Sequence, residues 1–365
     1  MMAHKVPATY YDGWAIHCSP DRFYVFNKND LSSSGMKTRY RNIKKYKPQH
    51  NFFIEEDFYY IDWSIKGISF KVKPEITDFL VSSGLSIKCV DDLAIDEEKE
   101  EIIRIDSYDK FISYQIQMDN WIITTSDDVK INPVDFKLML NDYIFSKVGV
   151  LIEENYFANY LENMWNDLKA SIDNDISTLK AGDEITLSRK IDVLEFFVIQ
   201  YLRCDKRIKT DIEPMLDIFK SIFIDMGADE RCISEMKNDG LLSSSVYFYG
   251  ILLDAARGDK TRIRYYIDLF DKNYCLDVLQ APKDFSFLTS NFPCVFSKKI
   301  EGSKEEILFP IKNSCCLRFR RKHNQTDLGK YILLTSSELQ SINNDIVSGI
   351  GDIIISEYEN IDFLL

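Results

Sequence analysis

His4-Lys5-Val6-Pro7-Ala8-Thr9-Tyr10-Tyr11-Asp12-Gly13-Trp14 is the stretch of this sequence that most constrains its fold. Three aromatic side chains follow a proline, whose ring fixes one backbone angle. A disordered terminus would carry neither feature, so we expect this segment to be built into the fold. His4 is one of 4 histidines among 365 residues, which makes it a candidate for a specific role.

Length and composition indicate a globular protein, because apolar residues make up 45% of the chain and aromatic residues 13%. The net charge of −13 argues against a non-specific coat for nucleic acid, although it leaves open a nuclease with a local basic groove. No secretory leader follows Met1 and no apolar run reaches the ~18 residues of a membrane span. We expect a cytoplasmic protein with no membrane partner, whose eight cysteines are reduced core thiols.

The order of sequence patterns predicts an α+β fold in one domain over residues 1–365. A mixed, β-rich part (1–130) precedes a helical part (131–282), and β segments with a closing helix follow (283–365). We expect antiparallel β segments from the two end parts to pack with the helical middle. Apolar periodicity predicts helices over residues 151–173, 186–209, 212–227, 246–256 and 263–279. Alternation and turn residues predict strands over residues 23–26, 121–125, 285–289, 307–310, 315–320 and 331–335.

The same order of motifs resembles an uncharacterised, mainly bacterial group, domain-of-unknown-function family 4238. That family opens with His-x-Val-Pro-x-x-Tyr, which residues 4–10 match. It continues with a helical Gln-x-x-Arg pair, matched by Gln200 and Arg203, and a Ser-Asp-Asn-Pro turn, in which Ser290 and Pro293 match. Weaker matches lie at Phe23 to Phe26, Phe58-Tyr59, Ile152 to Ile172, Phe309-Pro310-Ile311 and around Asn343.

Two departures from the family pattern bear on activity. Asn291 and Phe292 stand where the family turn has Asp and Asn, and Cys204-Asp205 replaces Thr-Pro after the arginine. If the family's aspartate is catalytic, this member is inactive or differently tuned. The resemblance itself supplies no activity, because the family is uncharacterised and a fold does not define a function.

Five residues are candidates for a catalytic set. His4 suits proton transfer, because the unperturbed pKa of histidine lies near neutrality. Arg203 suits an anion clamp for phosphate or carboxylate, and Gln200 lies three residues earlier on the same helix face. Ser290 and Asn291 follow a predicted strand, where they could orient a substrate or stabilise an oxyanion.

Each candidate also has a structural interpretation. His4 could anchor the N-terminal segment by one hydrogen bond. Arg203 could pair with a helix glutamate, and Ser290 with Asn291 could form a turn that satisfies its own backbone.

Arg318, Arg320 and Arg321 belong to the densest positive cluster, and alternation places the first two on one strand face. They suit an anion or RNA contact, and a solvated strand edge is the alternative. The chain has no P-loop, no HExxH motif, no clustered Cys/His site and no dinucleotide fingerprint. We therefore expect neither a cofactor nor a metal ion.

Two functions remain open. The first is an enzyme acting on a phosphate-containing substrate, RNA or a nucleotide, by metal-independent phosphodiester cleavage, in an intracellular effector such as one of phage defence. The second is a non-catalytic binding or interaction module, in which the candidates form a buried polar network that fixes the N-terminal segment. Candidates that line one open pocket would favour the enzyme, whereas dispersed or sealed candidates would favour the module. The sequence does not indicate an oligomeric state.

Overall fold

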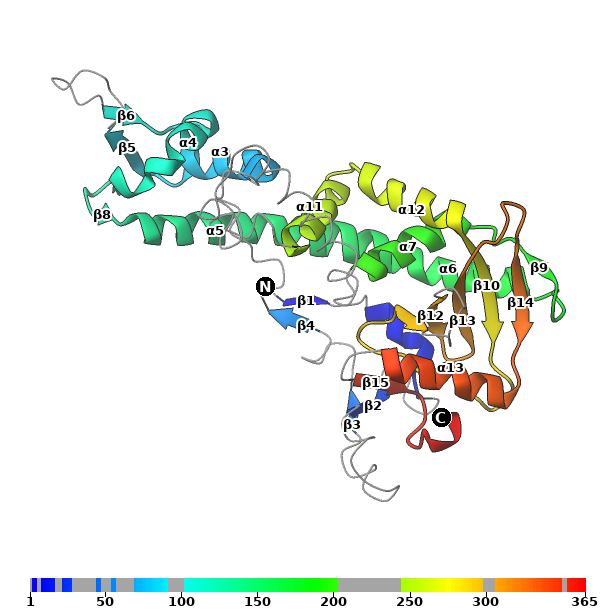
Figure 1. Cartoon of the computed structure of the whole chain (residues 1–365). Coiled ribbons are helices and arrows are strands. Elements are labelled where there is room, and N and C mark those ends of the chain that lie inside the picture. Colours follow the sequence, from blue (N-terminus) through cyan, green and yellow to red (C-terminus); the bar gives the residue numbers. More distant parts are fainter. Residues whose placement is uncertain are drawn as a thin grey trace, which may run out of the picture. The chain divides into compact units, whose positions relative to one another are not determined.

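The fold combines helices with several mainly antiparallel sheets, which confirms the predicted α+β class (Figure 1). The computed structural model describes residues 2–4, 8–16, 22–27, 44–46, 54–56, 69–90, 102–202, 244–297, 306–349 and 353–365. The chain divides into two compact units. The first comprises Met1, Asp57–Ile152 and Asp211–Leu253, and the second comprises Met2–Glu56, Glu153–Thr210 and Asp254–Leu365. Each unit is assembled from segments that are distant in the sequence. The single domain predicted over residues 1–365 stays a prediction.

The first unit contains a four-stranded antiparallel sheet. Its strands, in spatial order, are β6 (Ile102–Arg104), β5 (Ser86–Val90), β7 (Trp121–Thr124) and β8 (Lys130–Ile131). The helical elements of this unit are η3 (Ser69–Val72), α3 (Lys73–Ser82), α4 (Tyr108–Tyr114), η4 (Gln115–Asn120) and α5 (Pro133–Val150). Trp121 packs edge-on against Phe111 of α4 and Phe136 of α5, with centroids 5.8 and 5.9 Å away. Helices therefore cover one face of the sheet.

A six-stranded sheet forms the centre of the second unit. Its strands, in spatial order, are β11 (Val295–Ser297), β12 (Glu306–Lys312), β13 (Cys315–Arg321), β10 (Tyr274–Gln280), β14 (Gly329–Leu333) and β9 (Glu184–Ile185). Only the β10–β14 pair is parallel among these. Smaller sheets pair β1 (Met2–His4) with β4 (Ile54–Glu56), and β2 (Phe23–Asn27) with β15 (Ile353–Ser356) and β3 (Lys44–Tyr46).

Helices of the middle and the end of the chain complete the described part. They are the π-helix η5 (Leu151–Glu162), α6 (Asn163–Ile176), α7 (Lys190–Leu202), α11 (Ser244–Ala256), α12 (Thr261–Asn273), α13 (Ser336–Gly349) and the 3-10 turn η7 (Asp362–Leu364). The helix predicted over 151–173 is present, but helical structure already begins at Pro133. The helix predicted over 212–227 lies outside the described residues.

Two element predictions are wrong. The helix predicted over 263–279 ends at Asn273, because residues 274–280 pair with β13 and β14 as strand β10. The strand predicted over 285–289 makes only a single bridge, at Thr289. Its backbone bonds elsewhere: the Leu288 N–H donates to Oδ1 of Asn343 at 3.0 Å. A side chain from α13 thus takes the place of a neighbouring strand.

The central sheet of the second unit is buried on both faces. On one face, the Phe197 ring of α7 stacks on Phe319 of β13 at 3.8 Å, and Trp165 of α6 stacks on Phe196 at 4.1 Å. On the other face, α13 closes a core of fully or nearly fully buried side chains. That core includes Leu279, Phe287, Leu288, Val295, Leu308, Cys316, Leu339, Ile346 and Ile354. Each face thus buries apolar side chains against helices, which stabilises their packing on the sheet.

The N-terminal segment is built into this unit, as its sequence predicts. It forms the 3-10 turn η1 (Ala8–Trp14), in which Tyr10 and Trp14 are fully buried. The Tyr10 hydroxyl donates to the Pro310 carbonyl and lies 2.8 Å from Oγ1 of Thr289, while Trp14 Nε1 donates to the Phe287 carbonyl at 2.8 Å. Burial raises the pKa of Tyr10 well above its ordinary value, so the hydroxyl stays protonated and keeps donating.

Gly13 makes this close approach possible. An added Cβ there would lie 2.8 Å from the Lys312 backbone, and the Gly13 carbonyl accepts from the Asn313 N–H at 3.0 Å. The turn η1 is therefore held directly against the end of β12 by backbone as well as by side chains.

The described cysteines agree with the prediction of reduced core thiols. Cys89, Cys275, Cys294, Cys315 and Cys316 are all free and buried. Burial raises the pKa of Cys315 to about 12, so this thiol stays protonated and unreactive at neutral pH.

Tyr10→Phe is expected to lower the free energy of unfolding by about 1–3 kcal/mol, because it leaves the buried Pro310 carbonyl without its donor. Denaturant unfolding of the full chain measures this. Tyr265→Phe is the matched control, since Tyr265 is 66% exposed and its hydroxyl should contribute little. Equal effects of the two substitutions would contradict an anchoring role for Tyr10.

Candidate functional site

Two of the predicted catalytic residues have no described side chain. His4 ends strand β1, where its backbone pairs with Ile54 of β4, and its side chain lies outside the described residues. Arg203 lies wholly outside them, directly after α7. A catalytic role for either residue stays a prediction.

Gln200 and Asn291 are buried. Gln200 is 2% exposed, on a helix that is buried along its whole C-terminal part, and Asn291 is 7% exposed. Neither side-chain atom of the Gln200 amide has a hydrogen-bond partner in the described part of the chain, and Oδ1 of Asn291 has none either. Buried amides without partners are uncommon, because leaving them unpaired costs about 1–3 kcal/mol each.

Ser290 forms the turn that its structural interpretation predicts. Its hydroxyl donates to the Phe292 carbonyl at 2.8 Å and accepts from the Phe292 N–H at 2.9 Å. The side chain is also fully buried. Both hydrogen-bonding functions of this hydroxyl therefore serve the local backbone, which leaves it poorly placed for a substrate.

The predicted anion-binding arginines are used within the fold. Nη2 of Arg318 donates to Oδ2 of Asp277 at 2.8 Å, and Nε of Arg320 donates to the same oxygen at 3.3 Å. Alternation does place both on one face of β13, as predicted, but that face carries a buried carboxylate. The other oxygen of Asp277 accepts from the Lys330 N–H at 3.0 Å. Arg321 is exposed at the end of β13 and pairs across the ladder with Tyr274.

Asp277→Ala is expected to destabilise the protein by about 2–4 kcal/mol, because two partly buried guanidinium groups lose their shared carboxylate. Thermal or denaturant unfolding measures the change. Asp268→Ala is the control: it breaks an exposed pair with Arg264 on α12 and should cost less than about 1 kcal/mol. If Asp277→Ala lowers the free energy of unfolding no more than Asp268→Ala does, Asp277 does not hold the two arginines.

A second buried ionic cluster was not predicted from the sequence. Glu195 of α7 has a side chain only 8% exposed, and Nζ of Lys260 lies 2.8 Å from Oε1. The hydroxyls of Tyr156 and Tyr160 donate to the two carboxylate oxygens at 3.3 and 3.1 Å. The Lys260 ammonium also lies 3.7 Å from the centre of the Tyr160 ring. This Glu195 cluster joins η5, α7 and the start of α12.

The pKa shifts in the Glu195 cluster favour its bonded state. Burial, reinforced by the Glu195 charge, raises the pKa of Tyr156 well above its ordinary value. Burial alone would lower the pKa of Lys260, but hydrogen bonds to Glu195 and Tyr160 outweigh it, so the pKa is raised. The tyrosines thus remain donors and the lysine remains charged. A lone carboxylate in the apolar run 193–202 was the available sequence signal, because a buried charge requires a partner.

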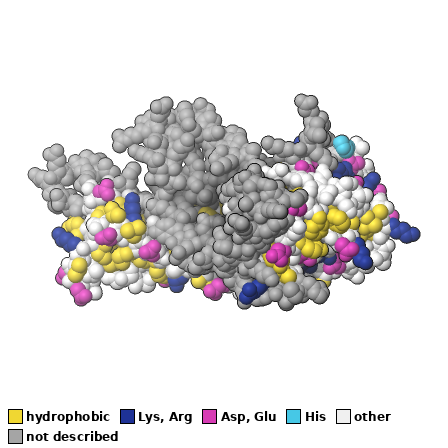
Figure 2. Space-filling view, turned by 90° about the horizontal axis from the view of Figure 1, so that it is seen from below, with side chains coloured by type: hydrophobic (Ala, Val, Ile, Leu, Met, Phe, Trp, Pro, Cys, Tyr) yellow, Lys and Arg dark blue, Asp and Glu magenta, His cyan; other side chains and the backbone are white. Residues whose placement is uncertain are grey.

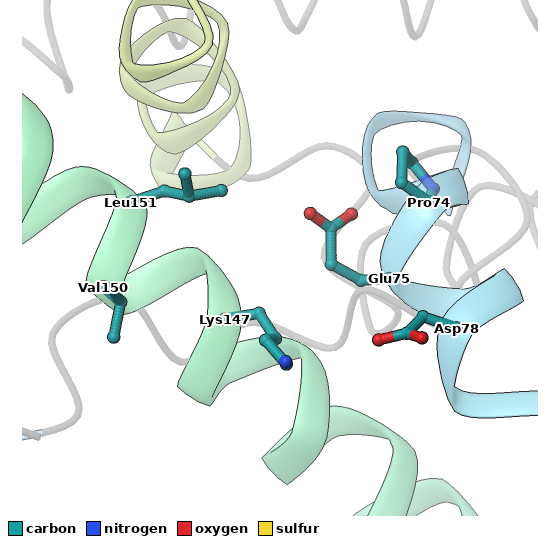
Figure 3. A pocket seen from close by; sticks show the side chains of 6 residues that line it. All are labelled: Pro74, Glu75, Asp78, Lys147, Val150 and Leu151. Atoms are coloured by element: carbon teal, nitrogen blue, oxygen red, sulfur yellow. The ribbon is translucent and has the colours of Figure 1, made fainter. Parts of the chain in front are cut away.

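An open pocket lies within the first unit, between α3 and α5 (Figure 3). Its volume is about 630 Å³, which falls within the range of small-molecule sites. The carboxylates of Glu75 and Asp78 point from α3 toward α5, whose side carries Lys147 and Val150. The hydroxyl of Tyr143 donates to Asp78. The remaining lining residues are Pro74 and Leu151.

The lining of this pocket combines two carboxylates and one lysine with apolar surface. No histidine, cysteine or serine is among its described lining residues. No group of three His, Cys, Asp or Glu residues gathers as a metal site would need, among the residues that the structure describes. The described helices also include none with the length and apolar character to cross a membrane. None of the pocket residues was predicted, because pairing of α3 with α5 is not visible in either helix alone.

In comparisons with known proteins, no family model, no curated protein and no solved structure matches the chain. The resemblance to family 4238 accordingly stays a prediction.

Proposed function

We propose that this protein is a non-catalytic binding module. The observation that carries the proposal is the burial of three of the five predicted catalytic residues: Gln200, Ser290 and Asn291 are each more than nine-tenths buried, and Ser290 is closed on its own backbone. Catalysis requires groups that touch a substrate, whereas these residues belong to the interior. The N-terminal segment is held by hydrogen bonds of Tyr10 and Trp14, whose partners are Thr289, Pro310 and Phe287 and not the candidate residues.

The pocket between α3 and α5 is the ligand site of this module. Its two carboxylates outnumber the single ammonium group of Lys147 and so favour a cationic group, and Val150 with Leu151 offers apolar surface to the rest of the ligand. Asp78 already accepts from Tyr143, which fixes the direction of its carboxylate before a ligand arrives. We therefore assign the pocket to a small molecule or side chain that combines an amine with an apolar body.

Phenethylamine, used as the probe, is expected to raise the melting temperature of the full-length protein. The double variant Glu75→Gln with Asp78→Asn should lose most of this shift, because it removes both negative charges from the pocket. Asp142→Asn, on an exposed position of α5, is the control and should keep it. The absence of a shift at millimolar probe, or an equal loss in the control, would contradict the assignment.

A second candidate function rests on one observation. The Gln200 amide and Oδ1 of Asn291 have no hydrogen-bond partner among the described residues, which favours a role in handling a polar substrate, as in a nuclease or nucleotide-acting effector of phage defence. Host growth and RNA integrity separate the two candidates. The binding module predicts intact RNA with wild type, His4→Ala and Arg203→Ala alike. RNA cleavage by wild type that either variant abolishes would favour the enzyme.

A further inference from the structure

No helix of the described residues covers the second face of the four-stranded sheet in the first unit. Alternation along β5 and β7 buries Ile87, Cys89, Trp121 and Ile123 on the helical side. Side chains of the opposite face are exposed: Lys88, Ile102, Arg104, Ile122 and Lys130. We call these five residues the outer face.

Two positively charged residues of the outer face lie directly opposite each other on neighbouring strands. Lys88 of β5 is the cross-strand partner of Arg104 of β6, and like charges at such positions destabilise a sheet. Neither residue forms an ion pair with a described residue. Asp106 interacts electrostatically with Arg104, but its carboxylate is already bonded to Nζ of Lys110 at 2.9 Å. Among the described residues, this positive pair therefore has no ion-pair partner, in a protein whose net charge is −13.

Apolar side chains flank this positive pair. Ile122 lies opposite Lys88 on the other side and is 44% exposed, while Ile102 on β6 is 60% exposed. Seen from below, the first unit, at the left of Figure 2, also has hydrophobic side chains open at the surface among charged ones. A partner that suits the outer face must combine anionic groups with apolar groups at the spacing of neighbouring strands, about 5 Å.

Two classes of anionic macromolecule have to be weighed. Sheet surfaces that bind single-stranded nucleic acid stack bases on aromatic side chains. None of the five residues of the outer face is aromatic, so the face offers no side chain on which bases could stack. This composition favours a protein segment with carboxylates beside aliphatic side chains.

We propose that the outer face docks an acidic, aliphatic segment of a partner protein. The carboxylates of the segment pair with Lys88 and Arg104, which relieves their mutual repulsion. Its aliphatic side chains cover Ile102 and Ile122. This surface is independent of the pocket between α3 and α5, so either assignment can fail without the other.

Fluorescence anisotropy with the full-length protein tests the proposal. The probe is a labelled peptide of about 10 residues that alternates glutamate with valine, since this length spans the sheet when extended. Wild type should bind it at low salt, and affinity should fall as salt increases. The double variant Lys88→Glu with Arg104→Glu should weaken binding at least about tenfold. Lys137→Glu, at an exposed position of α5, changes the same kind of charge elsewhere and should leave binding unchanged.

Three outcomes would overturn the proposal. The first is that wild-type protein does not bind the peptide although its circular dichroism spectrum shows that it is folded. The second is equal weakening by Lys137→Glu and by the double variant. The third is binding of an oligouridylate of similar length, lost in the double variant, without binding of the acidic peptide, which would assign the outer face to nucleic acid. The double variant Lys88→Glu with Arg104→Glu should keep the increase in melting temperature that phenethylamine causes. The test of the outer face is then independent of the test of the pocket.

Discussion

The second unit depends on the contact between the N-terminal turn η1 and the central sheet. The Tyr10 hydroxyl and the Trp14 indole bond to Thr289, Pro310 and Phe287, which follow them by more than 270 residues. Tyr10 also packs its ring 6.0 Å from Phe309, so one side chain contributes both polar and apolar contacts. Because these partners lie on β12 and in the segment before β11, the turn fixes both at once. Closing so long a loop is entropically unfavourable, and burial of two large aromatic side chains offsets it.

Polar residues of this unit are used mainly to bond backbone groups and neighbouring side chains of the fold. Asn343 accepts from the Leu288 N–H and donates to the carbonyls of Ser286 and Leu364. Asp277 binds two arginines and the Lys330 N–H, and Ser290 closes its own turn. Such fully bonded side chains specify a fold and are not free for chemistry. The first unit differs, since it exposes a pocket with two carboxylates and a sheet face with two opposed cations.

Local patterns in the sequence were sufficient for much of the fold. Aromatic residues after Pro7 indicate a buried turn, and alternation identifies β12, β13 and the shared face of Arg318 and Arg320. Contacts between segments that are distant in the sequence could not be predicted from such local patterns. The carboxylate that Arg318 and Arg320 share comes from a segment predicted as helix, whose strand conformation is imposed by β13 and β14. Glu195 likewise signals a buried charge, but nothing in the sequence identifies Lys260 as its partner.

Amide hydrogen exchange in Trp14→Ala tests the central role of η1 most directly. Loss of this fully buried side chain should cost about 3–5 kcal/mol. If η1 holds the sheet, exchange should accelerate by two or more orders of magnitude throughout β12 and β13, as well as in residues 8–16. Faster exchange confined to residues 8–16, with β12 and β13 protected as in wild type, would contradict this account.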